Sequence, residues 1–168
     1  EPRTLPSGNH SGFDLPPLSY VRFFDLNNGV AVGRLDSTVL RTSDGGRTWR
    51  SLKTEKTSGR WTSGAFLTPE DGIVVGAGSS YGTVVGEQLV TLAQPLRTFR
   101  RVNAASLARD RQGWLVGDGG FLLQSQDGGI SWMPPTGRLP TQLNDVFDFF
   151  CVDRNGTNVC VAGSPGGV

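Results

Sequence analysis

Residues able to do acid–base or nucleophilic chemistry are few in this 168-residue chain. His10 is the single histidine, and its Gly-, Ser- and Asn-rich surroundings indicate a solvated loop, so it supports no Ser-His-Asp or Cys-His site. Two carboxylates facing across a cleft would permit glycoside hydrolysis, but no pair of aspartates is marked out by its spacing. Two cysteines and one histidine are also too few for a four-ligand zinc site. We therefore expect no catalytic residues, no cofactor and no metal.

Arginine is the basic residue that this chain uses most, and five arginines fall within 15 residues of one another. The planar guanidinium group suits protein interfaces and carboxylate partners. Alternatively, these are solvated charges on strand edges, where they discourage aggregation. The candidate partner-binding residues are Arg97, Arg100, Arg101, Arg109 and Arg111.

An eight-residue phrase occurs twice, as Thr-Ser-Asp-Gly-Gly-Arg-Thr-Trp over 42–49 and Ser-Gln-Asp-Gly-Gly-Ile-Ser-Trp over 125–132. Its aspartate begins a tight turn, where a carboxylate can accept hydrogen bonds from unpaired N–H groups. Its glycines supply positive φ, and its indole ring offers a flat face for packing between sheets. The carboxylates are too few for a calcium loop. A structural role is predicted for Thr42, Asp44, Gly46, Trp49, Ser125, Asp127, Gly129 and Trp132.

The elements that carry this phrase recur with a period of about 42 residues. A residue pair ending in glycine lies between two apolar runs at Asn28-Gly29, Asp71-Gly72, Gln112-Gly113 and Asn155-Gly156. Asn-Gly and Asp-Gly predict tight β-hairpins. A second hairpin around the phrase, with a degraded copy expected at 92–99, gives four short strands per unit. This pattern is typical of a β-propeller blade.

The expected units are residues 19–58, 59–104, 105–142 and an incomplete 143–168, with 1–18 as candidate closing strands. We therefore predict a single all-β domain, a propeller of four-stranded antiparallel blades. It has about four blades or is part of a larger ring, completed by another chain or segment. The 24 glycines and 10 prolines argue against long helices.

Charge and hydropathy exclude two classes of partner. The net charge of +1 gives no long-range attraction to nucleic acid or to a membrane surface. No apolar run approaches the length of a membrane-spanning helix.

Cys151 and Cys160 flank Asn155-Gly156. If those two residues form the turn, the cysteines lie directly opposite each other in a pair without hydrogen bonds, with Cα atoms about 4.5 Å apart. We therefore predict a disulfide, which would imply an oxidising compartment. The alternative is two neighbouring thiols in a cytosolic strand pair.

The repeated phrase resembles the Asp-box, or bacterial neuraminidase (BNR) repeat, which is a fold-stabilising turn on the propeller rim. Two longer stretches, from Phe23 to Gly46 and from Val116 to Trp132, resemble the photosystem II assembly/stability factor family of cyanobacteria and plastids and its bacterial relatives. The resemblance covers approximately residues 19–168. It implies a seven-bladed ring and an arginine-rich face that binds a partner.

We therefore expect a non-catalytic scaffold that binds a partner protein, in assembly or stabilisation of a membrane complex of photosynthetic type. The expected location is extracytoplasmic: periplasm, thylakoid lumen or secreted. The first alternative is a sialidase or other propeller glycoside hydrolase, but neither Tyr20 nor Tyr81 has a recognisable glutamate partner for the sialidase nucleophile. The second alternative is a structural subunit of a larger complex.

Overall fold

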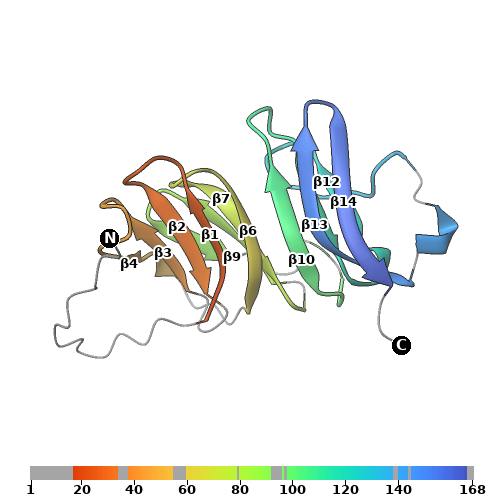
Figure 1. Ribbon diagram of the computed structural model, residues 1–168, viewed down its shortest axis with the longest axis horizontal. Coiled ribbons are helices and arrows are strands. Elements are labelled where there is room, and N and C mark those ends of the chain that lie inside the picture. The colour runs from red at the N-terminus through yellow and green to blue at the C-terminus, as the bar shows by residue number, and fades with distance from the viewer. Residues whose placement is uncertain are drawn as a thin grey trace, which may run out of the picture.

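The computed structural model describes residues 17–33, 38–54, 60–78, 80–91, 96, 98–137, 140–143 and 145–165. Within these residues the chain forms antiparallel sheets that stand face to face in chain order (Figure 1). The helical segments among them are two single 3-10 turns, and none is long and apolar enough to cross a membrane.

The first sheet has four antiparallel strands in sequential order. They are β1 (Leu18–Phe23), β2 (Gly29–Gly33), β3 (Val39–Thr42) and β4 (Arg50–Ser51). β2 is buried along its whole length, as expected for a strand covered on both faces.

The second sheet has the same order and gains one more strand. Its antiparallel strands are β6 (Trp61–Thr68), β7 (Asp71–Gly76), β8 (Tyr81–Val85) and β9 (Gln88–Thr91). β5 (Lys53–Thr54) pairs in parallel with β9. Since only Leu52 separates β5 from β4, the segment 50–54 belongs to two sheets.

The third and fourth sheets follow along the chain. Their strands are β10 (Val102–Leu107), β11 (Gly113–Gly117), β12 (Leu122–Ser125), β13 (Phe147–Asn155) and β14 (Asn158–Pro165). A bridge between Gln124 and Met133 adds a fourth row to the third sheet. The 3-10 turns are η1 (Asp118–Gly120) and η2 (Thr141–Leu143).

Apolar side chains fill the space between successive sheets. One cluster, with Val32, Trp61 and Phe66, joins the first and second sheets. The second and third sheets share a cluster that includes Tyr81 and Leu115, and the third and fourth share one that includes Val116 and Phe149. This stacking of short antiparallel sheets confirms the predicted all-β, propeller-type fold.

In each sheet, one glycine fixes the register between the first and second strands. Each first strand has an irregularity, and the residue before it pairs with the last glycine of the apolar run: Gly33, Gly76, Gly117 or Gly163. At the last three positions an added Cβ would overlap a backbone carbonyl oxygen at or just before the start of the first strand. The strands therefore approach more closely than any other residue allows.

The hairpins that were predicted at the four pairs ending in glycine exist, but the predicted turn residues are wrong. Between β6 and β7 the turn is Pro69-Glu70, because Thr68 pairs with Asp71. Gly72 lies within β7, where an added Cβ would overlap the ring of Phe66. The glycine therefore makes room for an aromatic side chain instead of forming the turn.

The predicted disulfide is also corrected. Asn155 pairs with Asn158, so Gly156-Thr157 form the turn, and the facing residues shift by two. Cys151 then lies opposite Ala162, and Cys160 lies opposite Asp153, which makes the cysteines diagonal neighbours. Both are free and exposed. The register is set by Gly163 at the irregularity, where no other residue fits, and not by the Asn-Gly pair.

The degraded phrase expected at 92–99 falls mostly outside the described residues, and the described part of the second sheet has a different turn between its third and fourth strands. Residues 92–95 and 97 lie outside the described residues, and Phe99, the expected counterpart of Trp49, is 98% exposed. In the second sheet the third and fourth strands are joined by the two residues Gly86-Glu87, since Val85 pairs with Gln88. Such a short turn leaves no row of free N–H groups for a carboxylate to bind.

Candidate functional site

The two copies of the repeated phrase form the same turn. In the first copy, Asp44 Oδ1 accepts hydrogen bonds from the Thr42 hydroxyl at 2.8 Å and the Thr48 N–H at 2.9 Å. The Thr42 hydroxyl accepts the Gly46 N–H at 2.9 Å. Both glycines of the phrase, Gly45 and Gly46, have positive φ.

In the second copy, Asp127 Oδ1 accepts the Ser125 hydroxyl at 2.7 Å and the Ser131 N–H at 2.9 Å. The Ser125 hydroxyl accepts the Gly129 N–H at 2.8 Å. Gly128 and Gly129 again have positive φ. Each turn is thus closed by its own side chains, with the hydroxyl residue buried and the aspartate toward solvent.

The two turns differ in how their tryptophans bond. Trp49 Nε1 donates to the Gly46 carbonyl at 3.1 Å. In the second turn the corresponding Gly129 carbonyl accepts the Tyr81 hydroxyl from the neighbouring sheet, and Trp132 Nε1 is buried without a hydrogen-bond partner among the described residues. Burial raises the pKa of Tyr81, which keeps its hydroxyl a donor. The second turn therefore also joins two sheets.

Acid should weaken both turns. Hydrogen bonds from Thr48 and Thr42 lower the pKa of Asp44 to about 2. At Asp127 burial raises the pKa, but the hydrogen bonds from Ser131 and Ser125 outweigh this effect and lower the pKa to about 2. Since a lowered pKa favours the folded state only while the group is ionised, this stabilisation is present above about pH 4 and is lost as the pH falls towards 2.

We expect urea unfolding at pH 7, 4, 3 and 2.5 to show stability falling over that interval. The double variant Asp44→Asn/Asp127→Asn should be less stable at pH 7 and lose less stability in acid, with a residual slope from Asp25 and Asp110, whose pKa values are also lowered by hydrogen bonds. An acid slope unchanged by the double substitution would contradict this assignment.

A cleft of about 530 Å³ opens where the first strands of all four sheets come together. β1, β6, β10 and β13 all contribute to it, and Figure 1 shows these strands side by side across the molecule. The first sheet contributes Tyr20 and the adjoining Phe24 to the lining, and the third and fourth sheets contribute Arg109 and Arg154. The cleft is therefore built from residues that are far apart in the sequence.

Three arginines give this cleft its charge. Arg22 donates to the Phe66 carbonyl at 2.8 Å and lies 5.1 Å from the centre of the Phe24 ring. Arg154 forms an ion pair with Asp110 at 2.7 Å, and its bond lowers the pKa of that carboxyl. Arg109 is exposed. Among the described residues that line the cleft, Asp153 is the single acid, so the cleft favours an anionic ligand.

The structure divides the arginines that the sequence grouped together. Arg100 and Arg101 precede β10, whereas Arg109 and Arg111 follow it, so about 20 Å of extended chain separates the two pairs. Arg100 bonds to Asp145 and to the Gly119 carbonyl. Arg97 lies outside the described residues.

Of the four arginines of that set that the structure describes, Arg109 alone lines the cleft, where it joins Arg22 and Arg154. The sequence reasoning missed these last two because it sought arginines that are close along the chain. Comparison of the first strands of the four repeats would have found them, since those strands meet.

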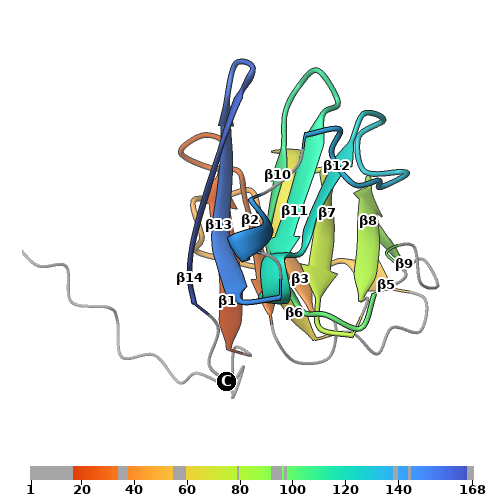
Figure 2. The ribbon, with the colours of Figure 1, turned by 90° about the vertical axis from the view of Figure 1, so that its right-hand side faces the viewer.

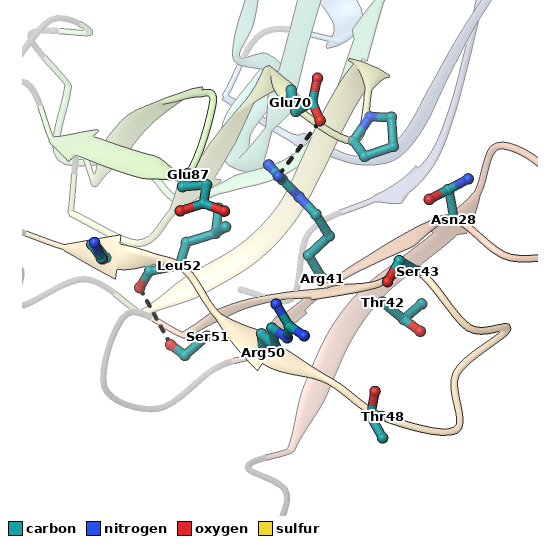
Figure 3. Close-up of a pocket in the computed structure, with 12 residues that line it drawn as sticks. Asn28, Arg41, Thr42, Ser43, Thr48, Arg50, Ser51, Leu52, Glu70 and Glu87 are labelled. Carbon is teal, nitrogen blue, oxygen red and sulfur yellow. Dashed lines mark hydrogen bonds and ion pairs between the residues drawn. The ribbon is translucent and has the colours of Figure 1, made fainter.

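A second pocket, of about 440 Å³, lies between β3 and β4 of the first sheet and two hairpin turns of the second (Figure 3). Arg41 points towards Glu70 at 3.9 Å and donates to the Gly86 carbonyl. Arg50, Lys53 and Glu87 complete its charged lining. Since Arg41 bonds to both hairpin turns, it acts there as a connection between sheets.

The sheets and the cleft define the class of molecule, a propeller-type protein. Comparison with known proteins found no matching family model and no matching curated protein. Among solved structures, YCF48 from Cyanidioschyzon merolae is similar, with a TM-score of 0.66 and 18% identity over 89% of this chain and 48% of that chain. A second structure, of YCF48 bound to D1 peptide, gives a TM-score of 0.59 and 19% identity over 70% of this chain and 40% of that chain.

This chain therefore spans less than half the length of either YCF48 structure. The likeness confirms the resemblance suggested by the sequence at the level of the fold.

Proposed function

We propose that this chain is a non-catalytic propeller module that binds an acidic, extended segment of a partner protein in the cleft between its first strands. The observation that carries the proposal is the convergence of three arginines, Arg22, Arg109 and the Asp110-paired Arg154, on one cleft whose described lining includes a single acid, Asp153. Guanidinium groups bind carboxylates in a planar, two-bond geometry, and Tyr20 and Phe24 provide apolar surface beside them.

The structural comparison supports a peptide as the ligand. One of the similar structures is YCF48 bound to D1 peptide, and the sequence resembles the family of photosystem II assembly factors. By analogy, the partner of this chain is a subunit of a membrane complex, and the module acts in the assembly of that complex. An extracytoplasmic location remains part of the proposal and depends on the family resemblance, because the free cysteines give it no support.

A glycoside hydrolase is less well supported. Retaining and inverting enzymes both need two carboxylates across the substrate, whereas the described lining of the cleft offers one. Other aspartates have structural bonds: Asp25 accepts the N–H groups of Asn27 and Asn28, and Asp148 accepts that of Gly119. Glu70 and Glu87 do share the second pocket, but Glu70 is paired with Arg41.

The test is a titration of labelled D1 peptide, with a scrambled peptide and a peptide whose carboxylates are amidated as ligand controls. We expect binding that weakens with salt, because the attraction is between charges. Arg109→Glu should weaken it at least tenfold, since it places a carboxylate in the cleft. Arg101→Glu is the matched control: it makes the same charge change on an exposed residue at the other end of β10 and should alter affinity less than twofold.

Loss of binding in Arg101→Glu but not in Arg109→Glu would move the site to the surface before β10. Turnover of a chromogenic sialoside or glycoside that disappears in Glu87→Gln would overturn the non-catalytic assignment.

A further inference from the structure

Two arginines, Arg41 and Arg50, lie directly opposite each other on β3 and β4. Side chains in such a pair project from the same face of the sheet, with Cβ atoms about 5 Å apart, and two like charges there destabilise the strand pair. Arg41 also lies opposite Val30, which belongs to the apolar cluster between the first two sheets, so both arginines are on the face that meets the second sheet. An anion bound between the two guanidinium groups would remove this repulsion.

The guanidinium group of Arg41 is held in place but has donors to spare. It donates to the Gly86 carbonyl, and the side chain is 17% exposed. Arg41 Nη1 lies 3.9 Å from Glu70 Oε1, which is too long for a hydrogen bond. Arg41 Nε is buried and has no hydrogen-bond partner among the described residues. An anion close to Nη1 would supply an acceptor at the distance that Glu70 does not reach.

Two more cations line this second pocket beside Arg41. Arg50 and Lys53 are exposed, and neither side chain forms a hydrogen bond or ion pair within the part of the chain that the structure describes. Figure 3 shows Arg41 and Arg50 on neighbouring strands of the pocket wall, with Glu70 and Glu87 across from them. Three cations and two carboxylates give the described lining a net charge of +1.

The size of the pocket and the kind of donors indicate the ligand. A volume of about 440 Å³ is in the range of sites for small molecules. A phosphate group carries close to two negative charges at neutral pH and three strong acceptor oxygens, so it can bond to two guanidinium groups and an ammonium group together. A carboxylate has one charge and two oxygens, which is too few for three cations.

We propose that the second pocket binds a phosphate group, as the inorganic ion or as the monoester of a small molecule, between Arg41 and Arg50 with Lys53 as the third cation. Glu70 opposes this binding, because its carboxylate competes for Arg41. The pocket is formed at β3 and β4, whereas the arginine cleft is formed at the opposite edge of the first sheet, at β1. The inference therefore does not depend on the proposed function.

The probes are inorganic phosphate and glucose 6-phosphate, each titrated into the chain at constant ionic strength and followed by NMR. We expect saturable shifts of the Nε–Hε signals of Arg41 and Arg50 and of the Lys53 amide, and acetate should bind at least tenfold more weakly. The probe that binds more tightly identifies the source of the phosphate. Binding of acetate as tight as that of phosphate, or no saturable shift at these three residues, would overturn the inference.

Arg50→Gln tests the contribution of the arginine pair, with Arg47→Gln as its matched control. Both variants remove one positive charge from an exposed arginine of the first sheet, but Arg47 is not part of the described pocket lining. We expect phosphate affinity to fall at least fivefold in Arg50→Gln and less than twofold in Arg47→Gln. Equal losses would mean a general attraction to positive charge and would overturn the inference.

Thermal unfolding shows whether the loss of affinity is due to loss of the fold. Without phosphate, Arg50→Gln should be at least as stable as the unchanged chain, because it relieves the repulsion from Arg41. Phosphate should raise the Tm of the unchanged chain and leave that of Arg50→Gln nearly unaltered at the same ionic strength. An equal rise in both proteins would place the phosphate elsewhere.

Glu70→Gln should change phosphate affinity in the opposite direction. Removing this exposed carboxylate leaves Arg41 without its competing ion pair, so phosphate should bind about threefold more tightly. A merely structural pocket predicts no gain in affinity from this substitution. Weaker binding in Glu70→Gln would contradict the proposed position of the phosphate at Arg41.

Discussion

Replacing Gly117 with alanine is expected to lower the free energy of unfolding by at least about 3 kcal/mol, with a fall in Tm of about 6–12 °C. Gly117 is buried opposite the irregularity in β10, where an added Cβ would overlap the carbonyl oxygen of Arg101. Backbone cannot move aside as a flexible side chain can, because Arg101 O also accepts the Asp118 N–H at 3.1 Å. Thermal unfolding followed by circular dichroism measures the change.

Gly137→Ala is the matched control for this substitution. An added Cβ at Gly137 has no atom within 4 Å, so its effect should be near zero or slightly stabilising. If the two alanine variants unfold at the same temperature, the close approach of the strands does not fix the register.

The second large effect is expected from Phe66→Ala, which should cost about 3–5 kcal/mol. Phe66 is fully buried between the first two sheets, and its ring stacks on Tyr20 with centroids 5.9 Å apart. Its ring also occupies the space left open by Gly72. Removing it leaves a cavity that this glycine cannot fill, and chemical denaturation measures the loss.

Phe150→Ala and Phe99→Ala are controls for Phe66→Ala, since these rings are 54% and 98% exposed. Each should change the free energy of unfolding by less than about 0.5 kcal/mol. A comparable loss in either control would mean that the exposed rings are covered in solution, for instance by a bound strand or a further sheet.

The sequence predicted the sheets well because their signals are local. Apolar runs that end in glycine and the repeated turn phrase recur at nearly constant spacing, and each acts within a few residues. The exact turns were mispredicted. Gly72, for example, is a glycine because its missing side chain makes room for the ring of Phe66, and a rule that considers only the turn residues does not include that contact. The disulfide failed for a related reason: the register is set at Gly163, seven residues beyond the turn that was used to derive it.

The candidate cleft was predicted only in part. Arg109 was identified, but Arg22 and Arg154 were not, because their proximity arises from the side-by-side packing of β1 and β13 with the strands between them. Such contacts depend on how whole sheets stack and have no signature in the spacing of residues. The repeated turns, by contrast, bond within themselves, so their residues could be named in advance.

The consecutive strands β4 and β5, which belong to different sheets, have a consequence for how the molecule unfolds. Leu52, between them, is buried in the first apolar cluster and donates to the Val39 carbonyl at 2.9 Å, while Lys53 donates to that of Glu87 at 3.1 Å. Because the segment 50–54 supplies an outer strand to each of the first two sheets, unfolding of one sheet would remove a strand from the other. We therefore expect the two sheets to unfold as one cooperative unit. Among the described residues, the hairpin of β13 and β14 shares no strand with the third sheet, so we expect its amide hydrogens to exchange before those of the first two sheets.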